Sequence, residues 1–339
     1  MGERYLVTGA CGFVGSHMVE LLASEGKEVR TTDLANADRS FIESRGVEFI
    51  PSDITQKETL EKPFKGVDYV FHIAALLDFA APWNLLKKVN VYGTENVCKV
   101  CVEQGVKRVV IWSTGGVYGV PDKDKLPITE DQPKNPTTNY EKSKWLVEKV
   151  CMKYHEEKKL GVTVIRPGGA IYGPRQIKWW AETLSLISKI PFPIFLPDFN
   201  NRVSFVHVKD IVGAAYHFCM TEEANGEAYN VGGDIAYTQS DFGEYFLQCL
   251  GKKVVRLGIP VNKTLVRFMV KIIRQMNRGF YTMFKPKSYL LQPDSIMYAL
   301  NDYWFSNEKL KSAGYEHKYP DPKEGMKETI EWYRAEGYI

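Results

Sequence analysis

A glycine-rich turn near the start of the chain joins a short apolar run to an amphipathic segment. Residues 8–15 read TGACGFVG, residues 4–7 are mostly apolar, and residues 13–22 have apolar side chains at helical spacing. Glycines let the backbone turn tightly and bring a pyrophosphate against the free N–H groups and the dipole of a helix N-terminus. The order strand, glycine turn, helix therefore predicts a dinucleotide-binding site.

The next strand-like segment indicates which dinucleotide binds. Residues 28–32 lead into Asp33, which follows the glycine turn at the expected distance of about 20 residues. A carboxylate there accepts the adenosine ribose hydroxyls and repels the 2′-phosphate of NADP. Leu34 adds no cation beside it, so the sequence favours NAD, while Arg30 and Arg39 keep NADP open as an alternative.

Strand-like and helix-like segments alternate through the first half of the 339-residue chain. This alternation predicts an α/β fold with a Rossmann-type, doubly wound parallel sheet and ligands at the carboxyl ends of its strands. We expect an NAD-binding domain over 1–168 and a smaller C-terminal substrate-binding lobe over 169–339, with 203–218 and 229–250 returning to the core. The expected strands are 4–7, 28–32, 47–50, 68–75, 108–113 and 162–165, and the longest expected helices are 13–22, 85–103 and 140–158.

Composition limits the compartment and the class of protein. Charged residues make up 25% and apolar residues 44%, as in ordinary globular proteins,. No apolar run reaches the ~20 residues of a membrane-spanning helix, and the N-terminus lacks a signal-peptide core. The six cysteines form no disulfide framework, and the C-x-x-C at 98–101 has no second pair that would complete a zinc site,. We expect a cytoplasmic protein that binds no metal.

Tyr140 and Lys144 are the strongest candidates for catalysis. Their spacing of four residues in a helical segment places both side chains on one face,. An ammonium beside a phenol favours the phenolate, which makes the tyrosine a general acid or base toward a ketone or an alcohol. Ser113 and Thr114 follow the fifth expected strand and bring hydroxyls to the same cleft.

Taken together, these motifs resemble those of the extended short-chain dehydrogenase/reductase family, and the likeness runs through essentially the whole chain. Besides the glycine turn and the Tyr/Lys pair, the matching segments are Asp53-Ile54, 72–75, the N-x-x-G-T-x-N segment at 90–96, Arg166-Pro167 and 171–174. The resemblance implies that Tyr140 exchanges a proton with the substrate oxygen and that Thr114 hydrogen-bonds this oxygen. It also implies that Lys144 holds the nicotinamide ribose and lowers the Tyr140 pKa, while NAD carries the hydride.

The resemblance also assigns the remaining site residues and suggests a homodimer built on 85–103 and 140–158. The expected cofactor-binding residues are Gly9, Gly12, Phe13, Val14, Gly15, Asp33, Leu34, Asp53, Ile54, Ala74, Ala75, Asn90, Ser113, Tyr140, Lys144, Pro167 and Gly168. The expected substrate-binding residues are Leu77, Phe79, Trp83, Thr114, Gly115, Tyr140 and Ala170.

The family divides into enzymes of nucleotide sugars and enzymes that oxidise apolar secondary alcohols, as the 3β-hydroxysteroid dehydrogenase-like members do. Members of the sugar branch usually carry an Asn just before Tyr-Gly-Pro, but residues 166–174 contain none, and this loop is one residue longer than usual. Residues 76–83 are apolar and aromatic, where a sugar site needs hydrogen-bonding partners,. These two features favour an apolar substrate, although 76–83 could equally be lid packing.

A basic segment in the C-terminal third is the last distinctive feature. Residues 245–293 contain ten of the 44 Lys and Arg residues and none of the 41 Asp and Glu residues. Within it, 261–284 reads as a basic amphipathic helix followed by apolar and aromatic residues. Such a helix can contact an anionic membrane surface, pack its apolar face on the substrate lobe, or attract an anionic substrate. The positive charge is confined to this segment and no nucleic-acid-binding motif accompanies it, so we expect no nucleic-acid partner.

The favoured function is therefore that of an NAD-dependent oxidoreductase interconverting a secondary alcohol and a ketone on a steroid- or isoprenoid-like substrate. One alternative is a nucleotide-sugar epimerase or dehydratase with tightly bound NAD, in which the hydride leaves and returns. A second alternative is a non-catalytic NAD-binding regulatory protein, which would have no use for the Tyr140 and Lys144 pair.

Overall fold

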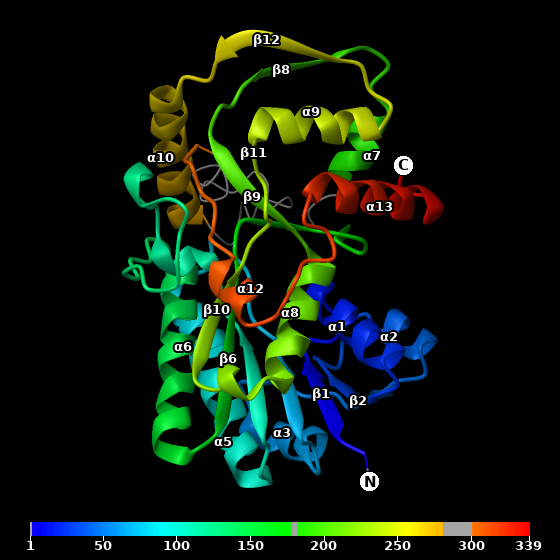
Figure 1. The fold of residues 1–339 in the computed structure, drawn as a ribbon, viewed down its shortest axis with the longest axis vertical. Coiled ribbons are helices and arrows are strands. Elements are labelled where there is room, and N and C mark those ends of the chain that lie inside the picture. Colours follow the sequence, from blue (N-terminus) through cyan, green and yellow to red (C-terminus); the bar gives the residue numbers. More distant parts are fainter. Residues whose placement is uncertain (1, 178–181, 281–299) are drawn as a thin grey trace.

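The computed structural model describes residues 2–177, 182–280 and 300–339, and within these it leaves the side chains of 182, 183, 260, 271 and 273–280 undescribed. Its centre is a seven-stranded sheet in which every neighbouring pair is parallel. In spatial order the strands are β10 (Glu227–Val231), β6 (Gly161–Pro167), β5 (Arg108–Trp112), β4 (Tyr69–His72), β1 (Arg4–Thr8), β2 (Glu28–Thr32) and β3 (Glu48–Phe49). The expected doubly wound α/β fold is confirmed (Figure 1).

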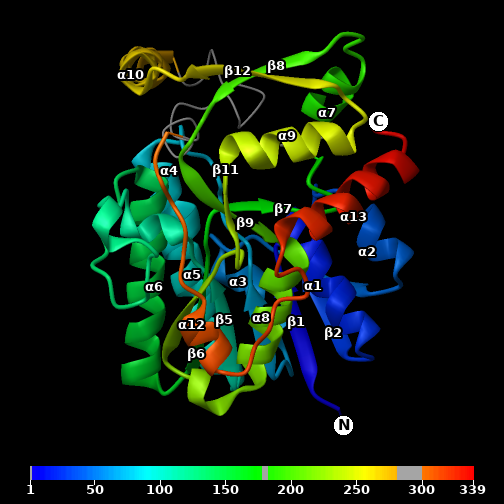
Figure 2. The same cartoon turned by 45° about the horizontal axis from the view of Figure 1, so that its top comes forward.

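Helices cover both faces of this sheet because alternate strand residues point to opposite sides. Tyr5 and Val7 belong to the core cluster beneath one set of helices, whereas Leu6 between them belongs to the cluster on the other side. The first face carries α1 (Phe13–Ser24), α2 (Ser40–Ser44) and α8 (Val208–Met220). The second carries α3 (Lys57–Phe64), α5 (Gly93–Gln104) and α6 (Asn139–Lys158) (Figure 2).

The segment expected as one helix over 85–103 is instead three consecutive pieces. They are the helical turn α4 (Trp83–Leu86), the π-helical segment η1 (Lys87–Tyr92) and α5. A π-helical turn holds an extra residue and often occurs at functional sites. The sequence periodicity does not reveal it, and its consequence is to turn Asn90 inward, where it is buried.

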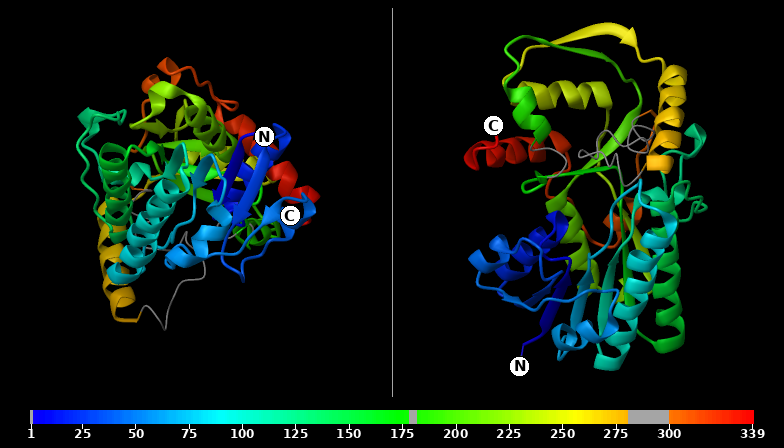
Figure 3. Two further views of the ribbon diagram at one scale, coloured as in Figure 1. Left: turned by 90° about the horizontal axis from the view of Figure 1, so that it is seen from below. Right: turned by 180° about the vertical axis from the view of Figure 1, so that it is seen from behind.

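The C-terminal part forms a smaller lobe over the carboxyl end of the sheet (Figure 3). Its core is an aromatic cluster that includes Tyr172, Phe242 and Tyr333. Its strands are β7 (Ala170–Tyr172), β9 (Arg202–His207) and β11 (Ala236–Thr238) in one sheet, and β8 (Ile194–Asp198) and β12 (Val254–Pro260) in another. Among the described residues its helices are α7 (Glu182–Ser188), α9 (Gln239–Cys249), α10 (Lys263–Phe280) and α13 (Pro322–Ala335). Helix α12 (Glu308–Ser312) instead packs on β10 of the central sheet. Short 3₁₀ turns that the structure describes are η2 (Gly115–Tyr118), η3 (Lys123–Lys125) and η5 (Glu222–Ala224).

The expected basic amphipathic helix corresponds to α10, but its apolar face does not pack on the lobe. Leu265, Phe268, Met269 and Ile272 are 47–61% exposed, whereas Val270 on the other side is buried. The expectation that this face covers the substrate lobe is therefore wrong for these four side chains. Residues 281–284 of the expected membrane-contact segment lie outside the described residues. None of the described helices has the length and apolar character needed to cross a membrane.

Candidate active site

A capping box fixes where α6 begins and so where Tyr140 lies. The Thr138 hydroxyl accepts the backbone N–H of Glu141, and the Glu141 carboxylate accepts the backbone N–H groups of Thr138 and Thr137. These bonds satisfy donors that a helix start otherwise leaves open. Tyr140 is thereby held in the first turn of α6, and Lys144 lies one turn later on the same face,.

Both members of this pair are buried, with 8% exposure for Tyr140 and 4% for Lys144. Burial lowers the pKa of Lys144 to about 8, so most of it still carries a proton at neutral pH. Burial, followed by the nearby Glu141 charge, raises the pKa of Tyr140 above the usual range of a phenol. The net shift of the Tyr140 pKa is therefore upward and is dominated by desolvation,, and the lowering of this pKa by Lys144 stays a prediction.

The two hydroxyls after β5 have different surroundings. Ser113 is buried, and its hydroxyl donates to Glu148 Oε1 at 2.5 Å. Thr114 is half-buried, and its hydroxyl caps the short turn η2 by accepting the backbone N–H of Gly116. Turn η2 packs against α6, the helix that carries Tyr140. Thr114 therefore precedes an element in contact with α6, whereas the Ser113 hydroxyl is bonded to Glu148.

A buried ion pair behind Ser113 is the main feature that sequence reasoning missed. Arg166 donates to both carboxylate oxygens of Glu148, at 3.0 and 2.6 Å, and to the hydroxyl of Tyr118 at 2.8 Å. Both ionic side chains are less than 10% exposed. The spacing could have indicated Glu148, which follows Lys144 by four residues and so extends the Tyr140–Lys144 face by one turn,.

The glycine turn between β1 and α1 fits a dinucleotide. A Cβ on Gly15 would lie 2.0 Å from the Gly9 carbonyl oxygen, and Gly9 itself has φ +68°, so neither position tolerates a side chain. Helix α1 begins after Gly12 without a side-chain cap and without an acidic residue in its first turn. Its first N–H groups, from Phe13 and Val14 onward, are therefore open to an anion.

Asp33 lies beside this turn, at the end of β2. Its carboxylate accepts the backbone N–H of Cys11 at 3.0 Å and that of Leu34 at 2.8 Å. These bonds orient the carboxylate and leave further acceptor positions for ribose hydroxyls. Leu34 is 48% exposed and lies next to it.

The two arginines that left NADP as an alternative cofactor, Arg30 and Arg39, both bond groups other than Asp33. Arg30 is buried and donates to Glu48 and to the carbonyl oxygens of Pro63 and Lys65. Arg39 pairs with Glu43. Neither side chain is held toward Asp33 by these bonds, which agrees with a site for NAD.

The expected adenine-side residues are tied to the π-helical segment and α5. Asp53 accepts the backbone N–H of Thr55 at 2.9 Å, and the Ile54 carbonyl accepts the Asn96 amide at 3.0 Å. Asn90 accepts the backbone N–H of Leu76 at 2.7 Å and donates to the Ser143 hydroxyl at 2.9 Å. The structure thus places Asn90 as a link between the loop after β4 and α6.

That loop forms an apolar wall around Tyr140. The Phe79 ring packs edge-on against the Tyr140 ring with centroids 5.2 Å apart, and both rings cluster with Leu76, Ala81 and Leu86. Ala74 is half-buried at the end of β4 and Ala75 is exposed. Leu77 and Trp83 are 38% and 36% exposed, so they lie at the rim of this wall.

Two aromatic residues from the far end of the chain complete the site, and no motif in the sequence indicates them. The Tyr303 hydroxyl donates to the Gly115 carbonyl oxygen at 2.6 Å. The Phe305 ring fills the space beside Gly115 and Gly168, where a Cβ on either would lie 2.4 Å from it. Pro167 and Gly168 thus end β6 against this ring, while Ala170 begins β7 and is exposed.

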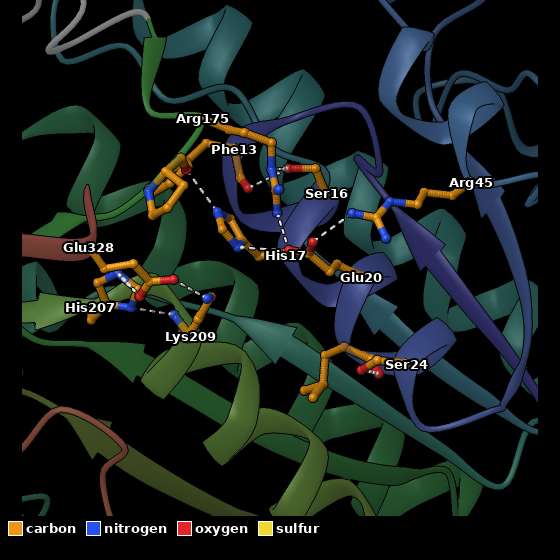
Figure 4. Close-up of polar contacts among 12 residues, drawn as sticks. Phe13, Ser16, His17, Glu20, Ser24, Arg45, Arg175, His207, Lys209 and Glu328 are labelled. Atoms are coloured by element: carbon orange, nitrogen blue, oxygen red, sulfur yellow. Dashed lines mark hydrogen bonds and ion pairs between the residues drawn. The ribbon is translucent and has the colours of Figure 1, made fainter. Parts of the chain in front are cut away.

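The loop after β7 fastens the lobe to the nucleotide-binding helix (Figure 4). Arg175 donates to the Ser16 hydroxyl at 3.1 Å and to Glu20 at 2.7 Å, and His17 bonds the Pro174 carbonyl oxygen at 2.7 Å. These contacts bring residues 172–175 over the first turns of α1. The segment 171–174, which the sequence matches to the family, is therefore anchored on α1 at its far end.

Comparison with known proteins agrees with this site. The NAD dependent epimerase/dehydratase family matches residues 5–232. The sterol-4-alpha-carboxylate 3-dehydrogenase, decarboxylating, of Bos taurus is 32% identical over 241 residues, which cover 68% of this chain and 65% of that protein. The 3beta-hydroxysteroid-dehydrogenase/decarboxylase isoform 1 of Arabidopsis thaliana is 28% identical over 360 residues, covering 97% and 79%.

Among solved structures, the UDP-glucose 4-epimerase of Thermus thermophilus in complex with NAD superposes with a TM-score of 0.75 and 25% identity, covering 99% of this chain and 100% of that one. The family match spans more than half of the chain and includes the glycine turn, Asp33 and the Tyr140–Lys144 pair. The chain therefore belongs to the NAD-dependent epimerase/dehydratase family and is an NAD-dependent enzyme of the extended short-chain dehydrogenase/reductase type.

Proposed function

We propose that this enzyme interconverts a secondary alcohol and a ketone on an apolar, steroid- or isoprenoid-like substrate. The observation that carries the proposal is the apolar wall beside Tyr140, in which Phe79 and Leu76 are only partly buried over Ala81 and Leu86 and Leu77 and Trp83 are exposed at the rim. An apolar substrate gains free energy by covering the exposed part of this wall, whereas sugar hydroxyls placed there would lose hydrogen bonds to water. The similarity to two steroid and sterol dehydrogenases supports the same class.

In this proposal the chain's own residues handle the proton and the orientation. NAD supplies the hydride chemistry. Tyr140 is protonated in its buried position, so it can donate a hydrogen bond or a proton to a ketone oxygen and can act as a base only when positive charge accumulates beside it. Lys144 provides one such charge, and the Thr114 hydroxyl orients the reacting oxygen.

The residues assigned to the cofactor hold it through the glycine turn and Asp33. Gly9, Gly12 and Gly15 give the pyrophosphate access to the N–H groups at the start of α1, and Asp33 receives the ribose,. We assign the remaining contacts to the side chains and backbone groups at the strand ends: Leu34, Asp53, Ile54, Ala74, Ala75, Ser113, Pro167 and Gly168.

A nucleotide-sugar epimerase or dehydratase is the second candidate. Its support is the superposition with the UDP-glucose 4-epimerase over 99% of the chain and the surplus of cations in 245–293. Against it stands the apolar wall, together with the absence of Asn from 166–174. A purely regulatory NAD-binding role is disfavoured, because burying a lysine and a tyrosine in one cleft costs stability and is useful mainly for catalysis.

The test measures NADH production by the purified enzyme with NAD and a panel of 3β-hydroxysteroids and other apolar secondary alcohols. UDP-, GDP- and dTDP-sugars are assayed alongside for isomers or dehydrated products. NADH with an apolar alcohol supports the proposal, whereas sugar products without net NADH support the second candidate.

The variant Tyr140→Phe separates catalysis from binding. It should lower kcat by about 10²–10⁴-fold, the range for a lost general acid or base, and leave NAD affinity nearly unchanged. Tyr92→Phe, on an exposed tyrosine, is the matched control and should retain full turnover. Undiminished turnover in Tyr140→Phe would refute the mechanism.

Three further expectations stay predictions. We propose a homodimer that uses α5 and α6, where Val102 of α5 is 38% exposed, and sedimentation velocity tests it. The division into domains 1–168 and 169–339 and a cytoplasmic location also await measurement.

A further inference from the structure

The exposed apolar residues of the lobe gather at the end of the molecule farthest from the N-terminus. Leu265, Phe268, Met269 and Ile272 follow one another at spacings of three, one and three along α10, which places them in one stripe. Their exposed fractions are 55%, 61%, 52% and 47%. On a helix of a water-soluble protein this stripe normally faces the core, so its exposure calls for a partner.

The two-stranded sheet β8–β12 lies at the same end of the molecule (Figures 1 and 2). Arg256 points toward α9, where it pairs with Asp241 and Glu244. The register of the two strands becomes irregular between Arg256 and Pro260, and the apolar side chains of this stretch are open to solvent. Leu257 and its neighbour Ile259 are 44% and 61% exposed.

The adjoining strand extends this surface. Phe195 pairs with Val255 in the register of the two strands and is 58% exposed, and Phe192 in the preceding loop is 65% exposed. The outward face of β8–β12 and the stripe on α10 are defined here as the apical surface, with members Phe192, Phe195, Leu257, Ile259, Leu265, Phe268, Met269 and Ile272.

The charges around the apical surface determine what can cover it. Lys189, Lys253 and Arg267 are exposed on the same elements or beside them, and the nearest acidic groups are already paired with Arg256. No acidic residue occurs in 245–293. Two copies of this chain meeting through the apical surface would bring like charges together, whereas an anionic phospholipid layer offers both a negative surface and an apolar interior.

We propose that the apical surface docks the protein on an anionic phospholipid membrane. Leu265, Phe268, Met269 and Ile272 insert among the acyl chains near the headgroups, and the surrounding cations contact the lipid phosphates. This goes beyond the proposed reaction and does not depend on it, because docking needs neither substrate nor turnover.

The helix that carries the apolar stripe is bonded to the chain segment that reaches Gly115. Arg267 on α10 donates to the Asn301 side chain at 3.0 Å, and two residues further on the Tyr303 hydroxyl bonds the carbonyl oxygen of Gly115. Arg267 lies on the side of α10 away from the stripe,, so a docked membrane is separated from this segment by the width of α10.

The test is co-sedimentation of the whole protein with vesicles of phosphatidylcholine alone and of phosphatidylcholine with phosphatidylserine. We expect binding to the vesicles that contain phosphatidylserine, and weaker binding as salt screens the cations. The double variant F268S/I272S should lower the partition coefficient by at least about tenfold, because two large apolar side chains no longer enter the acyl-chain region. M220S, on an apolar residue that is 43% exposed at the end of α8, should bind like the parent protein.

Two results would overturn the proposal. One is failure to bind either kind of vesicle, or binding that F268S/I272S does not change. The other is a self-association that sedimentation velocity detects in the parent and finds abolished in F268S/I272S, since the apical surface would then join two copies of the chain. Circular dichroism of each variant confirms folding, and the substrate assay is read separately, so a failed reaction does not bear on docking.

Discussion

Replacing Glu148 with alanine tests how much the buried ion pair behind the site stabilises the fold. The change removes both carboxylate acceptors of Arg166 and leaves its 6% exposed cation hydrogen-bonded to the Tyr118 hydroxyl. Removing one partner of a buried pair costs about 3–5 kcal/mol, because the remaining charge is neither solvated nor compensated. Ser113 also loses the acceptor of its hydroxyl.

This loss of stability predicts a measurable decrease in the melting temperature Tm. An unfolding entropy of about 2.1 cal/mol/K per residue over 339 residues predicts a Tm lower by about 4–7 °C. Urea unfolding followed by circular dichroism gives the free energy directly. The double variant E148M/R166M removes both charges and keeps most of the volume, so it should recover to within about 2 kcal/mol of the parent.

The control is E43A, which breaks the exposed Arg39–Glu43 pair, with side chains 47% and 61% exposed. Such a pair is worth about 0–1 kcal/mol. The reasoning would be refuted if E148A cost no more than E43A, or if E148M/R166M were less stable than E148A.

Three other predictions concern the cofactor site and pH. G15A should weaken NAD binding at least about tenfold, or 1.4 kcal/mol, because its Cβ would lie 2.0 Å from a carbonyl oxygen of the turn. Calorimetric titration measures the NAD affinity. The control variant G243A, with open space around the added Cβ, should bind NAD as the parent does. D33S/L34R should raise the affinity for NADPH relative to NADH about tenfold, and unchanged preference would contradict the ribose assignment. Burial lowers the pKa of His72 to about 3, so below pH ~6.5 the unfolded chain takes up a proton that the folded protein does not. As the pH falls between these two values, this group should lower the free energy of unfolding by about 1.4 kcal/mol per pH unit. In urea unfolding, H72Q should show a shallower decline with falling pH.

Short-range patterns in the sequence predict much of the fold and the site. The glycine turn, the alternation of strands and helices, and the four-residue spacing of Tyr140 and Lys144 are local, and the structure has β1, α1, β2 and α6 within a few residues of where these patterns place them. Backbone sterics and helical periodicity act over a few residues, so one chain segment is enough to reveal them.

Properties that depend on contacts between distant segments needed the tertiary structure. The pairing of Glu148 with Arg166, the docking of Phe305 beside Gly115, and the engagement of Arg30 by Pro63 and Lys65 each join segments that no local pattern relates. The π-helical segment that buries Asn90 also lies within a stretch whose periodicity predicts a plain helix.

The shift of the Tyr140 pKa and the outward orientation of α10 most clearly separate what the sequence determines from what the tertiary structure decides. The sequence by itself determined that a lysine lies one turn from the tyrosine and that α10 has an apolar and a basic side. Only the tertiary structure decided that Tyr140 is desolvated, which raises its pKa, and that the apolar stripe of α10 meets solvent. Burial depends on what the rest of the chain places around a residue, and a one-dimensional pattern of residue types does not contain that information.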